Sequence, residues 1–159
     1  RPQVVLTFDR TGFYGHPDHL AMHRHATEAF FLAGRDDVHP EHRREGLAPF
    51  TPARLYYAIF PRGPMRRLAR QAREAGYAVP EFLEGDAFGV PDEEVTTTVD
   101  VSAHVQQKRR AMAAHRTQMG NASPFEGLPE ELVDAFLAAE FFHRAHPPAE
   151  EGLREESLF

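Results

Sequence analysis

The sequence predicts an α/β fold whose sheet is mostly parallel, with an added antiparallel strand. Two short apolar runs, residues 4–8 and 55–60, have the length and content of buried strands, and a segment with helical periodicity follows each. Strand, helix and strand in this order imply a parallel pair joined by a crossover helix. Residues 95–101 alternate apolar and polar side chains, as a strand with one buried face does, and supply the antiparallel addition.

A tight loop separates the first strand from the first helix. Residues 4–8 are β-branched at their start, and Asp9 and Gly12 interrupt the apolar run. Pro17 can be the first residue of a helix, because the amide hydrogen that it lacks would be unpaired there. The helix is expected over residues 18–33. Its apolar residues, which recur at steps of three and four, are Ala21, Met22, Ala26, Ala29, Phe30 and Ala33.

The middle of the chain repeats this pattern after an irregular segment. Residues 34–53 show no periodicity, and a loop of about 20 residues in a compact domain is usually functional or mobile. The strand at 55–60 leads into a helix that Pro64 opens and Gly76 ends. Its apolar face comprises Met65, Leu68, Ala69, Ala72 and Ala75, and its arginines, Arg66, Arg67, Arg70 and Arg73, form a solvated face.

Two further helices are expected after the alternating strand. Ser102 can cap a helix that stops at Gly120. Its buried stripe is Val105, Lys108, Met112, His115 and Met119. The last helix begins near Pro129, and its buried face is Leu132, Val133, Phe136, Leu137 and Phe141. The segment 147–159 is acidic and contains proline, which is typical of a tail that is loose or packed on a neighbour.

The composition is that of one ordinary globular domain. The chain has 159 residues, 42% hydrophobic and 26% charged. The absence of cysteine excludes disulfides, cysteine-ligated zinc and thiol catalysis. A net charge of −6 argues against nucleic-acid binding. Because the sequence has neither a signal peptide nor a membrane-spanning apolar stretch, we expect a cytoplasmic protein.

The segment after the first strand concentrates groups suited to catalysis. His16 lies just before the first helical turn and His19 within it, so both imidazoles can face whatever occupies the end of the strand. A neutral imidazole is a good zinc ligand, and a charged one is a good proton donor. Asp18 can fix a tautomer of His16 or favour its charged form, and Tyr14 adds a phenol of the kind that stabilises an oxyanion.

These residues also have structural interpretations. Asp18 could serve only the helix dipole, and the His-Pro-Asp-His run could be a hydrogen-bonded loop. His19 and His23 have the spacing of the zinc-protease helix, but Leu20 stands where that motif needs Glu. We interpret His23 and His25 as surface or supporting residues.

Residues 4–24 resemble the second signature of the LmbE-like (PIG-L type) zinc-dependent N-deacetylases, a strand followed by Gly-x-Tyr-Gly-His-Pro-Asp-His. Further similarities follow in the family's order: Arg54-Leu55-Tyr56-Tyr57, Gly89-Val90-Pro91-Asp92-Glu93-Glu94, Ala114-His115-Arg116-Thr117-Gln118 and Glu140-Phe141-Phe142. The resemblance covers most of residues 1–145. It implies a Rossmann-like LmbE fold, with residues 1–146 as the carboxyl-terminal portion of the deacetylase domain and 147–159 as an acidic tail.

The resemblance also implies an activity. The family removes an acetyl or related acyl group from an amino sugar, typically an N-acetylglucosaminyl conjugate, with one zinc ion. His19 would then be a zinc ligand, and His16 would stabilise the tetrahedral oxyanion or protonate the leaving amine. Asp18 would orient and charge His16, and Tyr14 would hydrogen-bond the oxyanion. The expected protein is thus an amide hydrolase with Zn²⁺ as cofactor and a small-molecule amino sugar as substrate. Its oligomeric state stays open, a homo-oligomer included.

One departure from the family pattern is large. The family's first signature, Ala-His-Pro-Asp-Asp-Glu, supplies two more zinc ligands and the carboxylate base, and nothing like it occurs in these 159 residues. Because a catalytic zinc normally has three protein ligands, either the chain is the carboxyl-terminal part of a longer enzyme or the metal site has been lost. The start at Arg1, almost inside a strand, leads us to expect the first. A metal-free sugar- or nucleotide-binding module and an interaction subunit completed by a partner remain the alternatives.

Two later residues and two loops complete these expectations. His115 lies on a buried stripe, so a hydrogen-bonded core histidine is expected, with a wall of the substrate pocket as the alternative. Glu140 also falls on an apolar stripe and is expected to be paired there. The loops at 34–53 and 77–94 are expected to decide which conjugate is bound.

Overall fold

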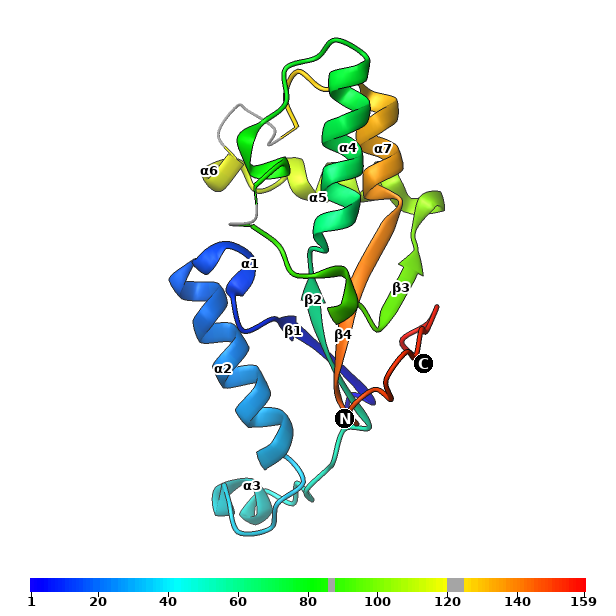
Figure 1. Ribbon diagram of the computed structural model, residues 1–159. Coiled ribbons are helices and arrows are strands. Elements are labelled where there is room, and N and C mark those ends of the chain that lie inside the picture. The colour runs from blue at the N-terminus through cyan, green and yellow to red at the C-terminus, as the bar shows by residue number, and fades with distance from the viewer. Residues whose placement is uncertain (86–87, 120–124) are drawn as a thin grey trace.

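The computed structural model describes residues 1–85, 88–119 and 125–159, which form a four-stranded sheet with helices around it (Figure 1). The strands are β1 (Val4–Phe8), β2 (Arg54–Ile59), β3 (Thr97–Asp100) and β4 (Ala139–His146). The helices are α1 (Gly12–Gly15), α2 (Pro17–Leu32), α3 (Pro40–Arg44), α4 (Arg62–Glu74), α5 (Val105–Ala113), α6 (Arg116–Met119) and α7 (Glu130–Leu137). Short 3-10 helices lie at Glu81–Leu83, Asp92–Glu94 and Ser102–His104.

The sheet is mixed, with strand order β1-β2-β4-β3. β1 and β2 are parallel, whereas β4 runs antiparallel to both β2 and β3. The predicted α/β fold is therefore confirmed, and β1, β2 and β3 point the same way. However, among the strand pairs that the structure describes only β1–β2 is parallel. The reversed strand is residues 139–146, between β2 and β3, and not residues 95–101 as the sequence pattern suggested.

Strand β4 replaces the expected end of the last helix. α7 stops at Leu137, and residues 139–141 begin the strand. Phe142, only 5% exposed, lies opposite Ala58 of β2 and Thr97 of β3. Aromatic residues favour strands, but their apolar character also fitted the helical stripe. The flanking strands β2 and β3 form the backbone hydrogen bonds of β4 on both of its edges. Because these strands are distant in the sequence, no local pattern in residues 139–146 indicates the pairing.

Helix α2 crosses one face of the sheet, close to its predicted bounds (Figure 1). Thr7 of β1 donates its hydroxyl hydrogen to the carbonyl oxygen of Met22 at 3.3 Å. The hydroxyl oxygens of Thr27 and Tyr57 lie 3.1 Å apart, which ties the helix to β2. Phe30 is 4% exposed and is the buried side chain of this helix. The amino-terminal half of α2 is thereby held over the end of β1.

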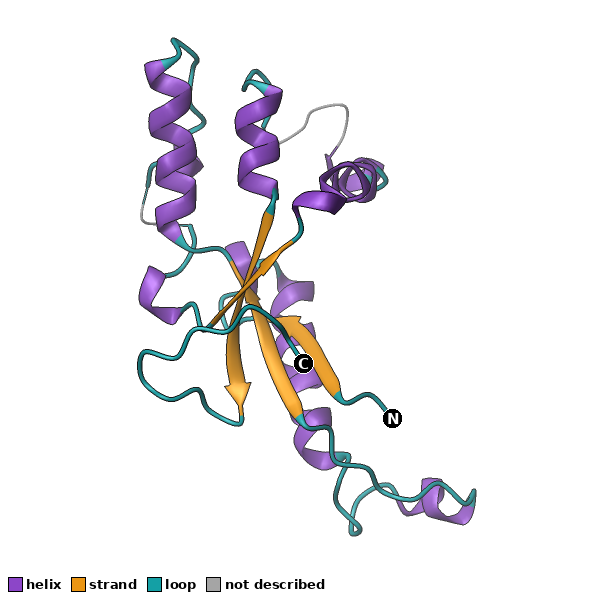
Figure 2. Cartoon of the chain, turned by 90° about the vertical axis from the view of Figure 1, so that its right-hand side faces the viewer, coloured by secondary structure: helices purple, strands orange, loops and turns teal. Residues whose placement is uncertain are grey.

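The larger apolar core lies beyond one end of the sheet, where α4 and α7 stand side by side (Figure 1; Figure 2). α4 buries the predicted face apart from Ala75, which is exposed, and Gly76, with φ +83°, ends the helix. The arginines expected on the solvated face of α4 are exposed. The buried side chains of this core are Met65, Leu68, Ala69, Ala72, Leu83, Val105, Leu128, Val133 and Leu137.

The helix expected from Ser102 to Gly120 is divided. A 3-10 turn opens it, α5 ends at Ala113 and α6 follows from Arg116. The amide of Ser102 donates to the Asp100 carboxylate at 2.8 Å, and Val101, not Ser102, occupies the N-cap position of the 3-10 turn. The expected stop, Gly120, lies outside the described residues, as does the side chain of Met119.

His115 is not a core residue. It lies between α5 and α6 and is exposed, and its Nδ1 donates to the carbonyl oxygen of Ala111 at 2.8 Å. The predicted stripe fails here because the helix breaks after Ala113, so the side chains beyond that point no longer follow the register of Met112.

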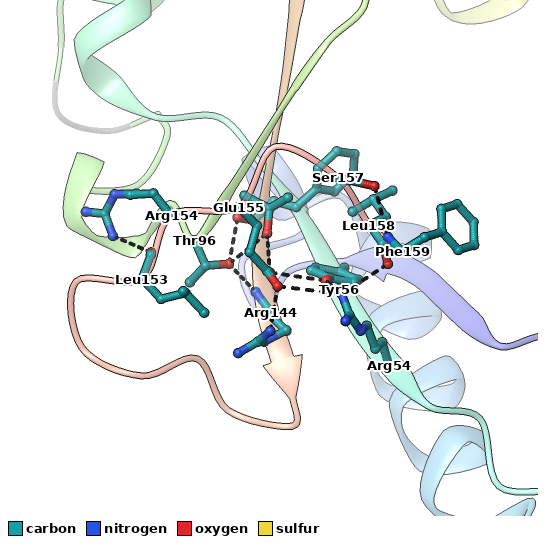
Figure 3. Close-up of polar contacts among 12 residues, drawn as sticks. Arg54, Tyr56, Thr96, Arg144, Leu153, Arg154, Glu155, Ser157, Leu158 and Phe159 are labelled. Carbon is teal, nitrogen blue, oxygen red and sulfur yellow. Dashed lines mark hydrogen bonds and ion pairs between the residues drawn. The ribbon is translucent and has the colours of Figure 1, made fainter.

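The acidic tail packs on the sheet (Figure 3). The backbone amide of Glu155 donates to the carbonyl oxygen of Thr96 at 2.8 Å, and Glu155 forms a parallel bridge with Thr97. The Glu155 carboxylate accepts hydrogen bonds from the Tyr56 hydroxyl at 3.2 Å, the Thr97 hydroxyl at 3.0 Å and Nη1 of Arg144 at 2.6 Å. One tail residue thus joins β2, β3 and β4.

The two loops expected to select the substrate differ in structure. Residues 34–53 are irregular apart from α3, and residues 77–94, of which 86–87 lie outside the described residues, carry two 3-10 turns.

In the part of the chain that the structure describes, no helix combines the length and apolar character needed to cross a membrane.

Candidate active site at the end of strand β1

The turn between β1 and α2 is organised by the carboxylate of Asp9, which is 4% exposed. It accepts hydrogen bonds from the Thr11 hydroxyl at 2.8 Å and from the Phe13 amide at 3.1 Å. Gly12 and Phe13 both have positive φ, +60° and +65°. A positive φ is unusual for phenylalanine and has to be held by its surroundings. Asp9 ends the predicted strand, and an Asp directly after a strand, with Thr two residues later, is also the sequence signal of this turn.

His19 is fixed in one tautomer. Its Nδ1 lies 3.1 Å from the carbonyl oxygen of Gly12, which can only accept, so Nδ1 carries the hydrogen. Its ring stacks on Phe8 with centroids 4.0 Å apart and planes 7° from parallel. Nε2 therefore keeps its lone pair on a ring that two contacts hold in place. A metal-ligating histidine is typically held in this way.

His16 is held through its neighbour's backbone. The amide of Asp18 donates to Nδ1 of His16 at 3.2 Å, which caps the amino terminus of α2. In that arrangement a neutral His16 carries its hydrogen on Nε2. The Asp18 carboxylate lies 4.0 Å from the same Nδ1, and its side chain is 87% exposed. The Asp18 carboxylate is therefore close enough to interact electrostatically with a protonated His16, but too far away to accept a hydrogen bond from its Nδ1.

The structure brings the predicted rings together at the carboxyl end of β1. The ring centroids of His16 and His19 are 5.1 Å apart, and Tyr14 lies 5.9 Å from His16 and 5.2 Å from His19. Tyr14 is 59% exposed, so its phenol is open to a ligand. We call these three residues the ring cluster. An amide bound against it would meet two imidazoles and a phenol.

Several curated proteins similar to this chain are named 1D-myo-inositol 2-acetamido-2-deoxy-alpha-D-glucopyranoside deacetylase. The protein from Thermomonospora curvata is 37% identical over 166 aligned positions, which cover 100% of the chain and 54% of that protein. Deacetylase 1 from Catenulispora acidiphila is 35% identical over 154 positions, 94% of the chain and 46% of that protein. The Nocardioides sp. protein is 37% identical over 150 positions, which cover 91% of the chain and 48% of that protein. The chain belongs to the LmbE-like (PIG-L) family.

This family member spans about half the length of the curated relatives that it matches. The matched half is their carboxyl-terminal part. No family model matches the sequence.

Among the described residues, His19 has the arrangement that a metal ligand needs, because its hydrogen-bonded Nδ1 leaves Nε2 free. Within residues 1–85, 88–119 and 125–159, no group of three or more His, Cys, Asp or Glu side chains could hold a metal ion. His19 can therefore be one ligand of a zinc site, but the described residues do not make up a full set of three.

The other predicted residues lie outside the ring cluster. Nδ1 of His23 donates to the carbonyl oxygen of Phe8 at 2.9 Å, which agrees with a supporting role, and His25 is exposed. Glu140 is paired as expected, with Lys108 at 3.2 Å, but from a strand and not from a helix.

Proposed function

We propose that the whole protein is a zinc-dependent hydrolase that removes the acetyl group of an N-acetylglucosamine-type conjugate, with this chain contributing the ring cluster. The observation that carries the proposal is the His19 ring, held by Gly12 and Phe8 beside His16 and Tyr14. The names of the matched relatives, deacetylases of a 2-acetamido-2-deoxy-glucopyranoside, support it. The β1–α2–β2 unit is the kind from which Rossmann-like sheets are built, and we propose that architecture for the whole domain.

The chain's own residues divide the chemistry between them. His19 would hold zinc through Nε2, with the remaining ligands supplied from outside the described residues. The ion would supply Lewis acidity, which polarises an amide carbonyl and activates water for attack. Tyr14 donates a hydrogen bond to the oxyanion that forms when water adds to the carbonyl.

His16 supplies the proton that the leaving amine needs. In its charged form, Nδ1 gives up the hydrogen bond that it accepts from the Asp18 amide, and Nδ1–H can turn to the Asp18 carboxylate, which lies 4.0 Å away, while Nε2–H points away from the helix terminus. When the carbon–nitrogen bond breaks, the Nε2 proton passes to the amine nitrogen and His16 becomes neutral. Asp18 stabilises the charged state before this transfer.

The test separates metal binding from proton transfer in the full-length protein. We expect His19→Ala to lower zinc occupancy. His16→Ala should keep the metal and lose turnover by about 10²- to 10⁴-fold, the usual contribution of a general acid. The measurements are zinc content by metal analysis and amine release from an N-acetylglucosamine conjugate. His25→Ala, at an exposed position of α2, is the control and should change neither.

Two results would overturn the proposal or its roles. A full-length protein with neither stoichiometric zinc nor amine release would exclude a deacetylase and favour a metal-free binding module. Loss of metal in His16→Ala, with metal kept in His19→Ala, would exchange the two roles.

A further inference from the structure

Asp9 is a buried carboxylate to which the proposed mechanism gives no task. It lies directly after β1 and is 4% exposed. Burial of a carboxylate is costly unless hydrogen bonds replace its contacts with water. The Thr11 hydroxyl lies 2.9 and 2.8 Å from its two oxygens, and the Phe13 amide donates to Oδ1 at 3.1 Å. The hydrogen bonds that compensate for the burial of Asp9 therefore come from the turn that leads to α2.

One peptide group links Asp9 to His19. The N–H of Phe13 and the C=O of Gly12 belong to the same planar unit, and because this peptide is trans the two groups point in opposite directions. The Asp9 carboxylate accepts from the N–H end at 3.1 Å, and Nδ1 of His19 donates to the C=O end at 3.1 Å. A continuous chain of hydrogen bonds thus runs from the carboxylate through the peptide to the imidazole.

This chain has a geometric and an electronic consequence. The rigid peptide cannot turn its carbonyl away from His19 without breaking the hydrogen bond to Asp9. Hydrogen bonds in a chain also polarise one another, and a bond to an ionised acceptor is stronger than one between neutral groups. The carboxylate at the N–H end therefore makes the Gly12 oxygen a better acceptor for Nδ1–H. A stronger bond at Nδ1 in turn raises the electron density at Nε2 of His19.

We propose that Asp9 is a positioning residue that acts on His19 through the peptide between Gly12 and Phe13. It keeps the ring hydrogen of His19 on Nδ1 and makes Nε2 a stronger ligand. A carboxylate bound directly to a zinc-ligating histidine has the same effect, and here a peptide stands between the two. The inference rests on the proposed function for the task of Nε2, which is metal binding. The control of the tautomer by Asp9 does not depend on that task.

Nitrogen NMR measures the tautomer of His19 directly. The full-length protein is labelled with ¹⁵N-histidine, freed of metal and studied at a pH at which its imidazoles are neutral. A ring nitrogen that carries hydrogen then differs in chemical shift from one with a lone pair. The His19 signals are assigned by their loss in His19→Gln, and we expect Nδ1–H in the parent protein. His23, whose Nδ1 donates to the carbonyl oxygen of Phe8 at 2.9 Å, is a reference in the same spectra.

Two substitutions of Asp9 separate its position from its charge. Asp9→Ala frees the peptide, so His19 should populate both tautomers. Zinc affinity, measured by competition with a chelator, should fall about 10- to 100-fold, the usual loss when the partner of a ligating histidine is removed. Asp9→Asn keeps an oxygen that can accept from Phe13 but removes the charge. It should preserve Nδ1–H, shift the Nε2 signal and lower zinc affinity by less than about tenfold.

A second aspartate provides matched controls. Asp36→Ala and Asp36→Asn make the same changes at a side chain that is 77% exposed, and they should alter neither the His19 signals nor zinc affinity. Nε2–H in the parent protein would overturn the proposal without any variant. An Asp9→Asn protein that matches Asp36→Asn in both measurements would also overturn it, and this comparison holds even where Asp9→Ala does not fold.

The positioning role and the proposed function can fail separately. Full-length protein with neither zinc binding nor amine release, but with His19 signals that respond to the Asp9 substitutions, would refute the proposed function and leave the positioning role intact. Zinc binding and turnover with His19 signals that ignore the Asp9 substitutions would refute the positioning role alone.

Discussion

Nδ1 of His19 donates a 3.1 Å hydrogen bond to the carbonyl oxygen of Gly12, seven residues earlier in the chain. The same glycine has φ +60°, and a Cβ at its position would lie 3.0 Å from the Cβ of His19. The backbone conformation of Gly12 therefore points its carbonyl oxygen toward the imidazole of His19. Because Gly12 has no side chain, the first turn of α2 can lie close to its backbone. The tautomer of His19 depends on both properties.

Replacement of Gly12 should test this relationship. Gly12→Ala is expected to lower the free energy of unfolding by about 2–4 kcal/mol. The alanine would have to adopt a positive φ, and its Cβ would be too close to α2, whose backbone cannot easily move away. Gly15→Ala, with φ +82° and open space around the new Cβ, should cost only about 1–2 kcal/mol. Urea denaturation measures both. Equal losses would contradict the role of the close approach to His19.

The Glu155 carboxylate should be a main stabilising contact of the acidic tail. Its side chain is 16% exposed and that of its partner Arg144 is 11% exposed. Glu155→Gln removes the charge that faces this arginine and should lower the free energy of unfolding by roughly 2–4 kcal/mol. Glu151→Gln, exposed in the same tail, should change it by less than about 0.5 kcal/mol. A similar small effect for both variants would show that the tail adds little to stability.

The contact between α2 and β2 predicts a smaller effect. Tyr57→Phe deletes the hydrogen bond to Thr27, so a loss of about 1 kcal/mol is expected. Tyr77→Phe makes the same chemical change on a side chain that is 45% exposed and serves as control. Thermal unfolding of the two variants against the parent chain gives the comparison. No difference between them would mean that the Thr27 contact does not hold the helix.

Asp100 should make part of the stability dependent on pH. The Ser102 amide, which donates to its carboxylate, lowers the pKa of Asp100 below the usual value. The unfolded state then binds the proton more readily, so this contribution is fully present above about pH 4 and is lost as the pH falls through the lower, folded pKa. The unfolding free energies of the parent chain and Asp100→Asn should therefore converge as the pH falls progressively below about 4. A difference that stays constant over this interval would rule out the carboxylate as its source.

Several elements were predictable because their signals are local. The helix at α2 and the buried face of α4 follow from apolar residues three and four positions apart, which one segment displays by itself. The ring cluster was predictable for a related reason. Tyr14, His16 and His19 lie within six consecutive residues on a turn, so few backbone paths could separate them.

The failures share one cause. Strand β4 has partners about 80 and 40 residues earlier in the chain, and no local pattern reports which segments will supply its hydrogen bonds. His115 matched a helical stripe that the break after Ala113 cancels. The positive φ of Phe13 depends on the Asp9 carboxylate, which the residue types alone do not place.

The sequence by itself determined the α/β class and the family, because periodicity and motif spacing are properties of short segments. Only the tertiary structure decided the order of the sheet, the attachment of the tail through Glu155, and the tautomer of His19 with its link to Asp9. Each of these depends on hydrogen bonds or packing between groups brought together by the fold, whose directions a linear pattern does not contain.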